Sequence, residues 1–159
     1  MEEAYLLLGS NLGDSKKYLS DAIIQITHLV GEASGMSSLY QTASWGKTNQ
    51  PDFINQVITV QTNLEPQQLL TTILVIEENL GRKRAEKWGS RTIDIDLLFY
   101  GNQIIREENL VVPHPFLQER RFTLLPLLEL NPDLVHPVLN KTIKQLYQQL
   151  NDNLSVLKL

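Results

Sequence analysis

Hydrophobic and polar positions alternate along the first hundred residues with a period of two in several short segments, which is typical of β-strands. Apolar or alternating runs predict three strands, at residues 4–8, 36–42 and 53–62. A fourth strand is predicted within the stretch RTIDIDLLFY, residues 91–100. Each run is bounded by glycine, proline or clusters of small polar residues, which favour turns.

Apolar residues spaced three and four apart predict two helices between these strands. The first helix is expected to start at Asp14 or Ser15 and to run to about Val30. The second is expected to start at Pro66 and to end near the pair Leu80-Gly81. The resulting order, β-α-β-β-α-β, predicts a ferredoxin-like α+β fold, in which helices pack on one face of an antiparallel sheet.

Residues 1–159 are expected to form a single domain, because a chain of this length buries a core without disulfides or structural metal. Beyond residue 100 the pattern predicts a short strand at 103–105, a tail punctuated by prolines, and a final helix near 142–150. Because folds of this class host many functions, the fold alone does not identify the chemistry.

The chain has no cysteine, which excludes disulfides, cysteine-ligated metals and a thiol nucleophile. Its first residues resemble neither a secretory signal nor a membrane span. A net charge of −4 argues against a general surface for nucleic acid or anionic membranes. These features favour a cytoplasmic protein that binds neither nucleic acid nor membrane, and we also expect a monomer.

Asp94 and Asp96 interrupt an otherwise apolar strand, where a buried carboxylate is costly without a partner. Side chains alternate between strand faces, so the two aspartates share one face, with Cβ atoms roughly 6.5–7 Å apart. Carboxylates at this spacing favour a Mg²⁺ ion that is shared with substrate phosphates. The alternative is an edge strand with two hydrated aspartates. The apolar residues are expected on the opposite, core-facing side: Ile93, Ile95, Leu97 and Phe99.

A basic segment, GRKRAEKWGSR at residues 81–91, directly precedes this strand. Guanidinium groups present fork-shaped donors that match phosphate. Carboxylates for a metal beside arginines for phosphate are the groups that phosphoryl transfer requires. The alternative is a solvated loop whose charges keep the protein soluble. Five of the 14 basic residues of the chain lie here: Arg82, Lys83, Arg84, Lys87 and Arg91.

Two further polar residues are candidates for a site. Glu77 lies within the apolar stripe of the second predicted helix, where it is expected to pair with a cation or to hydrogen-bond a ligand. A structural salt bridge is the alternative. His114 lies between two prolines in a rigid segment and is the best candidate among the three histidines.

Aromatic residues indicate a second half of the site. Phe53 and Asn55 are expected on one face of the third strand, where they can stack a flat heterocycle and hydrogen-bond its edge. Pterins and purines have such a ring. The alternative, an ordinary strand end, fits these two residues equally well. Trp45 and Trp88, each beside a glycine in a predicted loop, are candidates for contact with a ligand or for a closing lid.

Taken together, these residues resemble the 6-hydroxymethyl-7,8-dihydropterin pyrophosphokinase family of folate biosynthesis. The resemblance runs nearly end to end, in the family order, and the stretch KWGSRTIDIDLL is close to diagnostic. It implies a ferredoxin-like α+β fold and transfer of the β,γ-pyrophosphoryl group of ATP to the pterin hydroxymethyl group, leaving AMP. The matching segments are LLLGSNLGD (6–14), YQT and QPDFIN within 40–55, IEENLGR (76–82), KWGSRTIDIDLLFYG (87–101) and VPHPFLQERRFTLLPL (112–127).

The resemblance also implies roles for individual residues on the ATP side. Asp94 and Asp96 would bind two Mg²⁺ ions that bridge the phosphates of ATP, the co-substrate. Arg82 and Arg91 would be catalytic, since they would stabilise charge on the transferred group. The remaining ATP-site residues would be Glu77, Arg84, Trp88, His114 and Arg120, together with Arg91.

On the pterin side, the resemblance places the ring between Phe53 and Phe122, with its edge held by Asn55 and by backbone around Thr42. Ala43 and Trp45 would line the same pocket. Four positions depart from the family pattern, and they bear on pocket closure and nucleotide affinity rather than on the reaction. In the family, glutamine is common at the position of Leu74, proline at that of Ala43 and a smaller apolar residue at that of Trp45, and tyrosine can occur at that of Phe53.

Two other classes of protein remain as alternatives. A ferredoxin-like RNA-binding module would use the basic loop on phosphates, but the sheet lacks the paired aromatics of the RNA-recognition type. A metal-dependent nucleotidyltransferase or nuclease would also use paired aspartates. Release of AMP, as opposed to pyrophosphate, distinguishes a pyrophosphokinase from a nucleotidyltransferase.

Overall fold

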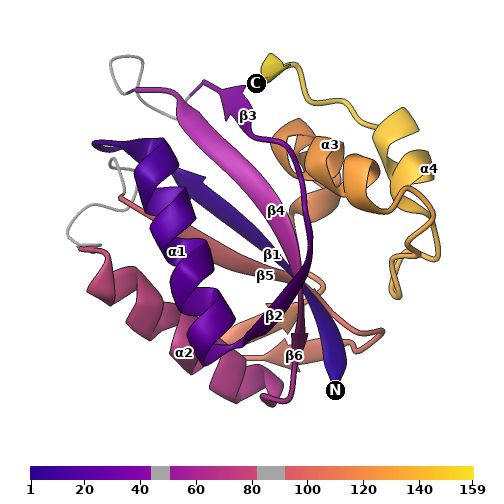
Figure 1. Cartoon of the computed structure of the whole chain (residues 1–159). Coiled ribbons are helices and arrows are strands. Elements are labelled where there is room, and N and C mark those ends of the chain that lie inside the picture. Colours follow the sequence, from indigo (N-terminus) through magenta and orange to yellow (C-terminus); the bar gives the residue numbers. More distant parts are fainter. Residues whose placement is uncertain (44–50, 82–91) are drawn as a thin grey trace.

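The computed structural model describes residues 1–43, 51–81 and 92–159. Within these residues, a six-stranded antiparallel sheet has the order β5-β1-β4-β3-β8, and β2 also pairs with β4 (Figure 1). Its strands are β1 (Glu2–Ser10), β2 (Gly31–Met36), β3 (Tyr40–Thr42), β4 (Phe53–Thr62), β5 (Asp94–Tyr100) and β8 (Val156–Lys158). The remaining elements are a hairpin of β6 (Ile105–Glu107) and β7 (Leu110–Val112), the 3-10 helix η1 (Leu117–Glu119), and the helices α1 (Ser15–Leu29), α2 (Pro66–Asn79), α3 (Arg121–Leu130) and α4 (Ile143–Gln148).

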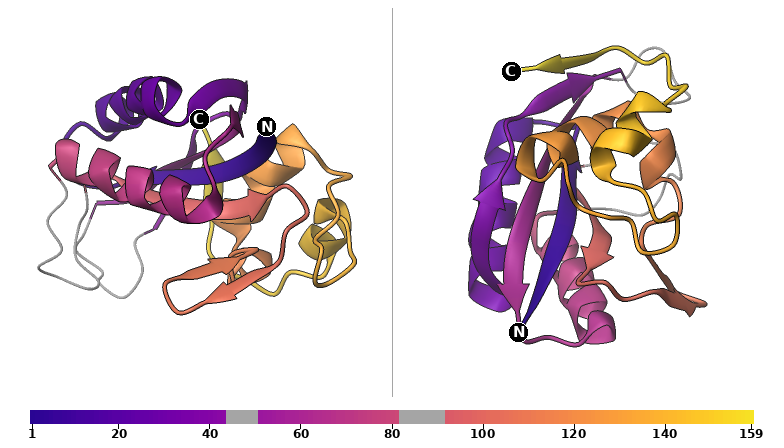
Figure 2. Two further views of the ribbon diagram at one scale, coloured as in Figure 1. Left: turned by 90° about the horizontal axis from the view of Figure 1, so that it is seen from below. Right: turned by 90° about the vertical axis from the view of Figure 1, so that its right-hand side faces the viewer.

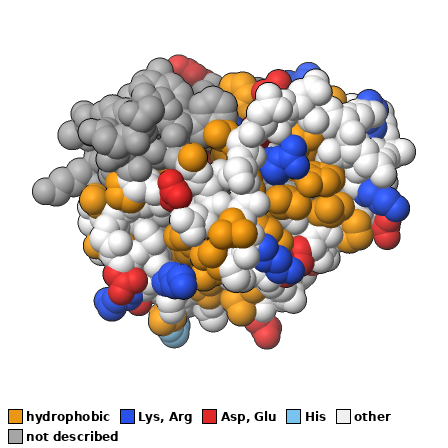
Figure 3. Space-filling model, turned by 90° about the horizontal axis from the view of Figure 1, so that it is seen from above, with side chains coloured by type: hydrophobic (Ala, Val, Ile, Leu, Met, Phe, Trp, Pro, Cys, Tyr) orange, Lys and Arg blue, Asp and Glu red, His pale blue; other side chains and the backbone are white. Residues whose placement is uncertain are grey.

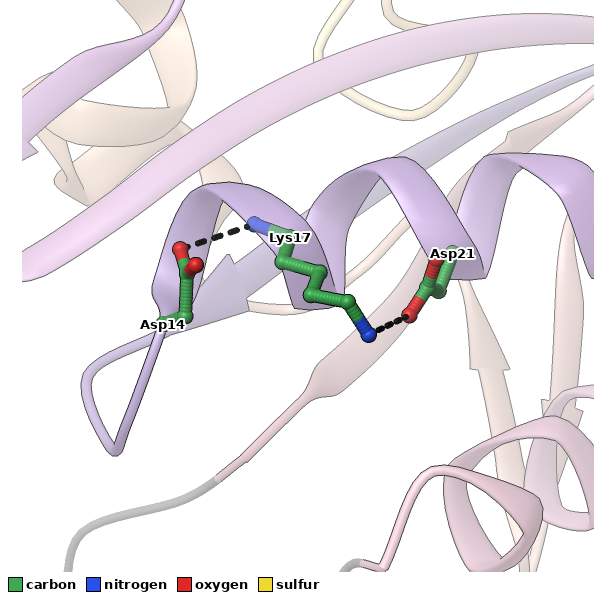
Figure 4. A network of polar contacts seen from close by, with 3 residues as sticks. All are labelled: Asp14, Lys17 and Asp21. Carbon is green, nitrogen blue, oxygen red and sulfur yellow. Dashed lines mark hydrogen bonds and ion pairs between the residues drawn. The ribbon is translucent and has the colours of Figure 1, made fainter.

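Both long helices begin where the sequence predicts. Asp14 caps α1 by accepting a hydrogen bond from the backbone N–H of Lys17 at 3.2 Å, and Lys17 forms an ion pair with Asp21 one turn later (Figure 4). Pro66 occupies the first turn of α2, where its missing N–H costs no helical hydrogen bond. Among the helices that the structure describes, none is long and apolar enough to span a membrane.

Helices cover both faces of the sheet (Figure 2). α1 and α2 pack on one face, against apolar side chains of β1, β4 and β5. α3 and α4 pack on the other face, where a second core contains side chains of the same three strands. The α+β ferredoxin-like fold is confirmed, with α1 and α2 on one face as expected, and the residues after 100 add a second helical layer.

The strand expected at 36–42 is two strands, β2 and β3, which pair with successive parts of β4. The prediction misses residues 31–35 because this stretch, GEASG, has no β-branched or aromatic side chain. A Cβ on Gly31 would collide with the carbonyl oxygen of Gln61. The close approach of β4 therefore requires glycine, the residue type that argues against a strand on propensity alone.

The expectation that Phe99 shares a face with Ile95 and Leu97 is wrong. The register between β1 and β5 shifts at Leu98, which has no Cα partner in β1. This irregularity reverses the alternation that a regular strand would keep. Ile95 and Leu97 remain in the core beneath α1 and α2, whereas Phe99 joins the core beneath α3 and α4.

The segment after residue 100 is the least well predicted part of the chain. The short strand expected at 103–105 lies at 105–107 and forms a hairpin with β7. The prediction misses α3 because Pro126 lies inside it, yet Leu124 and Leu127 are fully buried and hold the helix against the sheet. The final helix, α4, lies within the predicted range of 142–150.

α3 is fixed to the sheet near its C-terminal end by Glu129. This carboxylate accepts hydrogen bonds from the backbone N–H of Ser38 at 3.0 Å and from the hydroxyl of Tyr40 at 2.6 Å. Burial and the Glu129 carboxylate raise the pKa of the Tyr40 hydroxyl, so this residue stays a donor. The polar contacts set the position of α3 relative to β3.

Candidate active site

Predicted site residues on β4 and β5 lie on one face of the sheet, in rows that cross β1; α3 and α4 cover this face in part. Gly9 on β1 lies directly opposite Asn55 on β4 and opposite Asp94 on β5. In the next row, Leu7 lies opposite Val57 and Asp96. Because directly paired residues point to the same face, the carboxylates and Asn55 flank β1 on a common surface.

Gly9 is a candidate site residue that the sequence does not predict, because the first strand is expected to end at residue 8. Here β1 continues to Ser10, and a Cβ on Gly9 would lie 2.5 Å from Oδ1 of Asn55 and 3.8 Å from the Phe53 ring. The absence of a side chain therefore lets Asn55 lie across β1 beside Phe53. Asn55 is buried, with 4% of its surface exposed, whereas Phe53 is half-buried.

Asp94 and Asp96 are half-buried, as expected for carboxylates that face a site rather than bulk solvent. Both come from one strand at alternate positions, so they present oxygen donors side by side. Within the described ranges, no group of three or more His, Asp or Glu residues is placed to hold a metal ion. A pair of carboxylates suits Mg²⁺, which keeps several waters and shares its remaining positions with substrate phosphates.

Glu77 lies beneath this strand, on α2, with 1% of its surface exposed. Its Oε2 accepts a hydrogen bond at 2.8 Å from the backbone N–H of Ile95, the residue between the two aspartates. The partner of Oε2 is thus the outer edge of β5. This contact ties α2 to the strand that carries the carboxylates.

His114, Phe116, Arg120 and Phe122 form a second cluster of predicted and neighbouring residues, joined to β5 through His114. The backbone N–H of His114 donates to the carbonyl of Leu98 at 3.0 Å, which joins this segment to the strand. The Arg120 guanidinium lies 5.3 Å from the ring centre of Phe116 and 5.6 Å from that of Phe122. Cation–π contacts with the two rings restrict the direction of the arginine side chain.

Burial lowers the pKa of His114 to about 4; the Arg120 guanidinium adds to this effect and the Asp94 carboxylate opposes it. The imidazole is therefore neutral at physiological pH. Its Nδ1 accepts a hydrogen bond from the backbone N–H of Phe116 at 3.2 Å, so the proton lies on Nε2. His114 thus offers one N–H donor in a region shared by a carboxylate and a guanidinium.

Thr42 and Ala43 lie at the end of β3. Thr42 is directly opposite Phe53 of β4, and it is buried, with its hydroxyl donating to the carbonyl of Ser155 at 3.2 Å. Ala43 is exposed beside it. The structure therefore brings Thr42 together with Phe53 and Asn55, three of the residues expected around the pterin. Five other predicted site residues lie outside the described residues: Trp45, Arg82, Arg84, Trp88 and Arg91.

On the face seen from above in Figure 3, hydrophobic side chains gather in the middle, and side chains of both charges, Lys and Arg as well as Asp and Glu, lie among and around them.

Comparison with known proteins identifies the family. The model of 7,8-dihydro-6-hydroxymethylpterin-pyrophosphokinase (HPPK) matches residues 5–132. The chain is 43% identical over 145 residues to the 2-amino-4-hydroxy-6-hydroxymethyldihydropteridine pyrophosphokinase of Aquifex aeolicus, covering 91% of this chain and 90% of the relative. It is 40% identical over 153 residues to the protein of the same name from Haemophilus influenzae, covering 91% and 93%.

Solved structures agree on the fold. Wild-type Plasmodium falciparum HPPK-DHPS with STZ-DHP matches at a TM-score of 0.78 and 20% identity, over 93% of this chain and 43% of that chain. At this identity the likeness concerns the fold alone, and the chain spans less than half the length of that protein. The resemblance inferred from the sequence motifs is confirmed. The chain belongs to the 7,8-dihydro-6-hydroxymethylpterin-pyrophosphokinase family.

Proposed function

We propose that this protein transfers the β,γ-pyrophosphoryl group of ATP to the hydroxymethyl group of 6-hydroxymethyl-7,8-dihydropterin, a step of folate biosynthesis. The observation that carries the proposal is the row Asn55–Gly9–Asp94 across three strands. The Asn55 amide is able to bind the edge of a heterocycle, and the Asp94 carboxylate is able to face a metal–phosphate complex. These two residues flank Gly9. This arrangement suits a reaction between a polyphosphate and a substituent carried by a flat ring.

In the proposed reaction, the hydroxymethyl oxygen attacks the β-phosphorus of ATP in line. A new O–P bond forms, the bond between the β-phosphorus and the bridging oxygen of the α-phosphate breaks, and AMP leaves with that oxygen. The hydroxyl proton passes to solvent or to a phosphate oxygen. The protein contributes mainly by holding the two substrates in line and by stabilising charge.

Asp94 and Asp96 are the residues that would hold two Mg²⁺ ions, and the chemistry of the donor set fits this role. Both donors are hard oxygens, and both are half-buried on the same sheet face as Asn55. When bound, Mg²⁺ would neutralise charge on the phosphates and orient them for attack.

The pterin would lie between Phe53 and Phe122, with Asn55 on its edge. Asn55 has both a donor and an acceptor on its amide, which matches the mixed edge of a pterin ring. The backbone around Thr42 and Ala43, together with Trp45, completes this side of the proposed pocket. Two aromatic faces stack the ring with little loss of conformational freedom in the protein.

The nucleotide would lie toward His114 and Arg120. The neutral His114 donates from Nε2, and Arg120 adds a fixed positive charge, so both suit phosphate oxygens. Arg82 and Arg91 are proposed to stabilise charge on the transferred group. Glu77, Arg84 and Trp88 complete the proposed ATP site.

Incubation of the purified protein with ATP, Mg²⁺ and the reduced pterin alcohol tests the proposal. AMP and the pterin diphosphate are expected in equal amounts, and omission of either Mg²⁺ or the pterin should stop the reaction. Release of pyrophosphate without AMP would instead indicate a nucleotidyltransferase. The proposal includes a cytoplasmic monomer whose partners are these two small molecules, and gel filtration at assay concentration tests the monomer.

A further inference from the structure

The last ten residues of the chain, 150–159, here called the C-terminal segment, contact two elements that flank the proposed pterin pocket. Asp152 lies at the N-terminus of α3, and β8 joins the edge of the sheet beside β3, as Figure 2 shows for the strand. The match to the family model covers residues 5–132, so the segment lies beyond the matched region.

Asp152 caps α3 from 31 residues away. Its Oδ2 accepts a hydrogen bond from the backbone N–H of Arg121, the first residue of α3, at 2.8 Å. The local N-cap residue, Arg120, has no capping side-chain hydrogen bond. The carboxylate therefore satisfies an N–H that a helix leaves without an intrahelical partner, and its charge is favourable at this end of the helix.

Arg121 reinforces the same contact through its side chain. Its guanidinium donates from Nη2 to the backbone carbonyl of Asp152 at 2.9 Å and from Nη1 to the hydroxyl of Tyr147 at 3.1 Å. The guanidinium also lies 5.6 Å from the centre of the Tyr147 ring. Asp152 itself is held by the backbone N–H of Leu154, which donates to Oδ1 at 2.9 Å.

The two consecutive arginines consequently point in different directions. Arg121 is directed to the C-terminal segment, whereas Arg120 lies between Phe116 and Phe122 in the site. A rotation of the first turn of α3 would move Arg120 and Phe122 together. The contacts of Arg121 and Asp152 oppose such a rotation.

The same segment supports the opposite wall of the pocket. Val156 pairs with Thr42, and Leu157 pairs with Gln41, so β8 completes the hydrogen-bonding edge of β3. The carbonyl of Ser155 accepts a hydrogen bond from the hydroxyl of Thr42 at 3.2 Å. One short segment thus contacts the end of β3 and the start of α3.

We propose that the C-terminal segment is a positioning element for the pterin pocket, and that Asp152 is its principal positioning residue. It holds the first turn of α3 through Arg121 and thereby sets the places of Phe122 and Arg120 relative to Phe53. This inference rests on the proposed function for its kinetic consequence, whereas the capping of α3 is independent of that function.

The test compares Asp152→Ala with Asp152→Asn and with Asp133→Ala, which removes an exposed carboxylate elsewhere in the described chain. Asp152→Ala should raise the KM for the pterin about tenfold with a much smaller change in kcat, because loss of one such hydrogen bond is equivalent to about tenfold in binding. Asp152→Asn keeps an oxygen that accepts the Arg121 N–H and should restore most of the affinity. Asp133→Ala should match the wild type.

Amide hydrogen exchange provides a readout that does not depend on turnover. Asp152→Ala should exchange faster at the backbone amides of the first turn of α3, and Asp152→Asn should not. A merely structural loss would lower the active fraction, and hence the apparent kcat, without changing KM. Unchanged KM and unchanged exchange in Asp152→Ala would overturn the inference.

Failure of the proposed function has a different signature. In that case the wild type forms no AMP, and exchange at α3 still decides whether Asp152 holds the helix. Tyr147→Phe removes one acceptor of Arg121 but keeps the ring, so its effects should be smaller than those of Asp152→Ala. A larger effect from Tyr147→Phe would contradict the assignment of Asp152 as the principal contact.

Discussion

Glu77 Oε2 accepts a hydrogen bond from the backbone N–H of Ile95 at 2.8 Å. Ile95 lies between Asp94 and Asp96, the two aspartates of the candidate site. β5 lies at the edge of the sheet, so this N–H points away from β1 and toward α2. A side-chain oxygen on an adjacent helix takes the place that another strand would fill. The position of Asp94 and Asp96 therefore depends on a side chain from a different element.

Replacement of Glu77 by alanine should reduce both stability and turnover. The Ile95 N–H would lose its acceptor in a buried place, which is expected to lower the free energy of unfolding by about 1–3 kcal/mol. Turnover should fall as well, because the strand segment with both aspartates loses its outer contact. Urea unfolding and steady-state kinetics measure the two effects.

Glu77→Gln and Glu78→Ala are the matched controls. Glutamine keeps an amide oxygen for Ile95, so it should retain most of the stability, while Glu78 is exposed on the same helix and should tolerate alanine. An alanine variant at Glu77 as stable as the one at Glu78 would show that the contact contributes little.

This contact illustrates which part of the site the sequence can predict. Helical spacing places Glu77 within the apolar stripe of α2 and requires a polar partner there. It cannot identify the partner, because Ile95 is 18 positions away and meets Glu77 only after α2 packs against β5. The candidate residues are predictable from type and spacing, but the contact that orients them is not.

The same limit applies to the fold. The periods of the first hundred residues predict α1, α2, β1 and β4, because each buries a regular face. Strand alternation also fails at Phe99, since an extra residue in β5 reverses the faces. The second helical layer is hidden by Pro126, whose cost to α3 is outweighed by packing that no local pattern shows.

Substitution of Asp96 should remove the metal-dependent reaction. Asp96→Ala deletes one of the two carboxylates proposed to hold Mg²⁺, and we expect no detectable AMP from the purified variant. The side chain is half-buried on the sheet surface, so the protein should remain folded. Glu108→Ala, an exposed carboxylate between β6 and β7, is the control. Full activity of Asp96→Ala would contradict the metal assignment.

Gly9→Ala tests the row that joins the two halves of the site. The new methyl group would lie 2.5 Å from Asn55 Oδ1, so the Asn55 side chain must turn away from β1. Since Gly9 does not have a positive φ, alanine fits the strand backbone. The KM for the pterin should rise about tenfold, the equivalent of one lost hydrogen bond, while the KM for ATP changes less.

Gly35→Ala is a matched control for this substitution. Its Cβ would lie 2.9 Å from the Thr59 hydroxyl, so it displaces a neighbouring side chain in the same sheet but away from the proposed pocket. Equal effects of both variants on the pterin KM would indicate a general disturbance of the sheet rather than a specific loss at Asn55.

The pKa of His114 leads to a prediction about stability and pH. Burial, with help from Arg120, lowers this pKa to about 4 in the folded protein, against 6.5 for an unperturbed histidine. The unfolded chain therefore binds a proton at His114 before the folded protein does. The contribution of neutral His114 to stability is fully present above about pH 6.5 and is lost as the pH falls toward 4.

His114→Gln removes this titration and keeps a polar side chain. Between pH 7 and pH 4.5, the wild type should lose about 2 kcal/mol more free energy of unfolding than the variant, from the separation of the two pKa values. Urea unfolding of both proteins at the two pH values gives this difference, in which the titration of all other groups cancels. An equal loss in both proteins would mean that His114 titrates normally, and the neutral Nε2 donor proposed for the nucleotide phosphates would then be charged at mildly acidic pH.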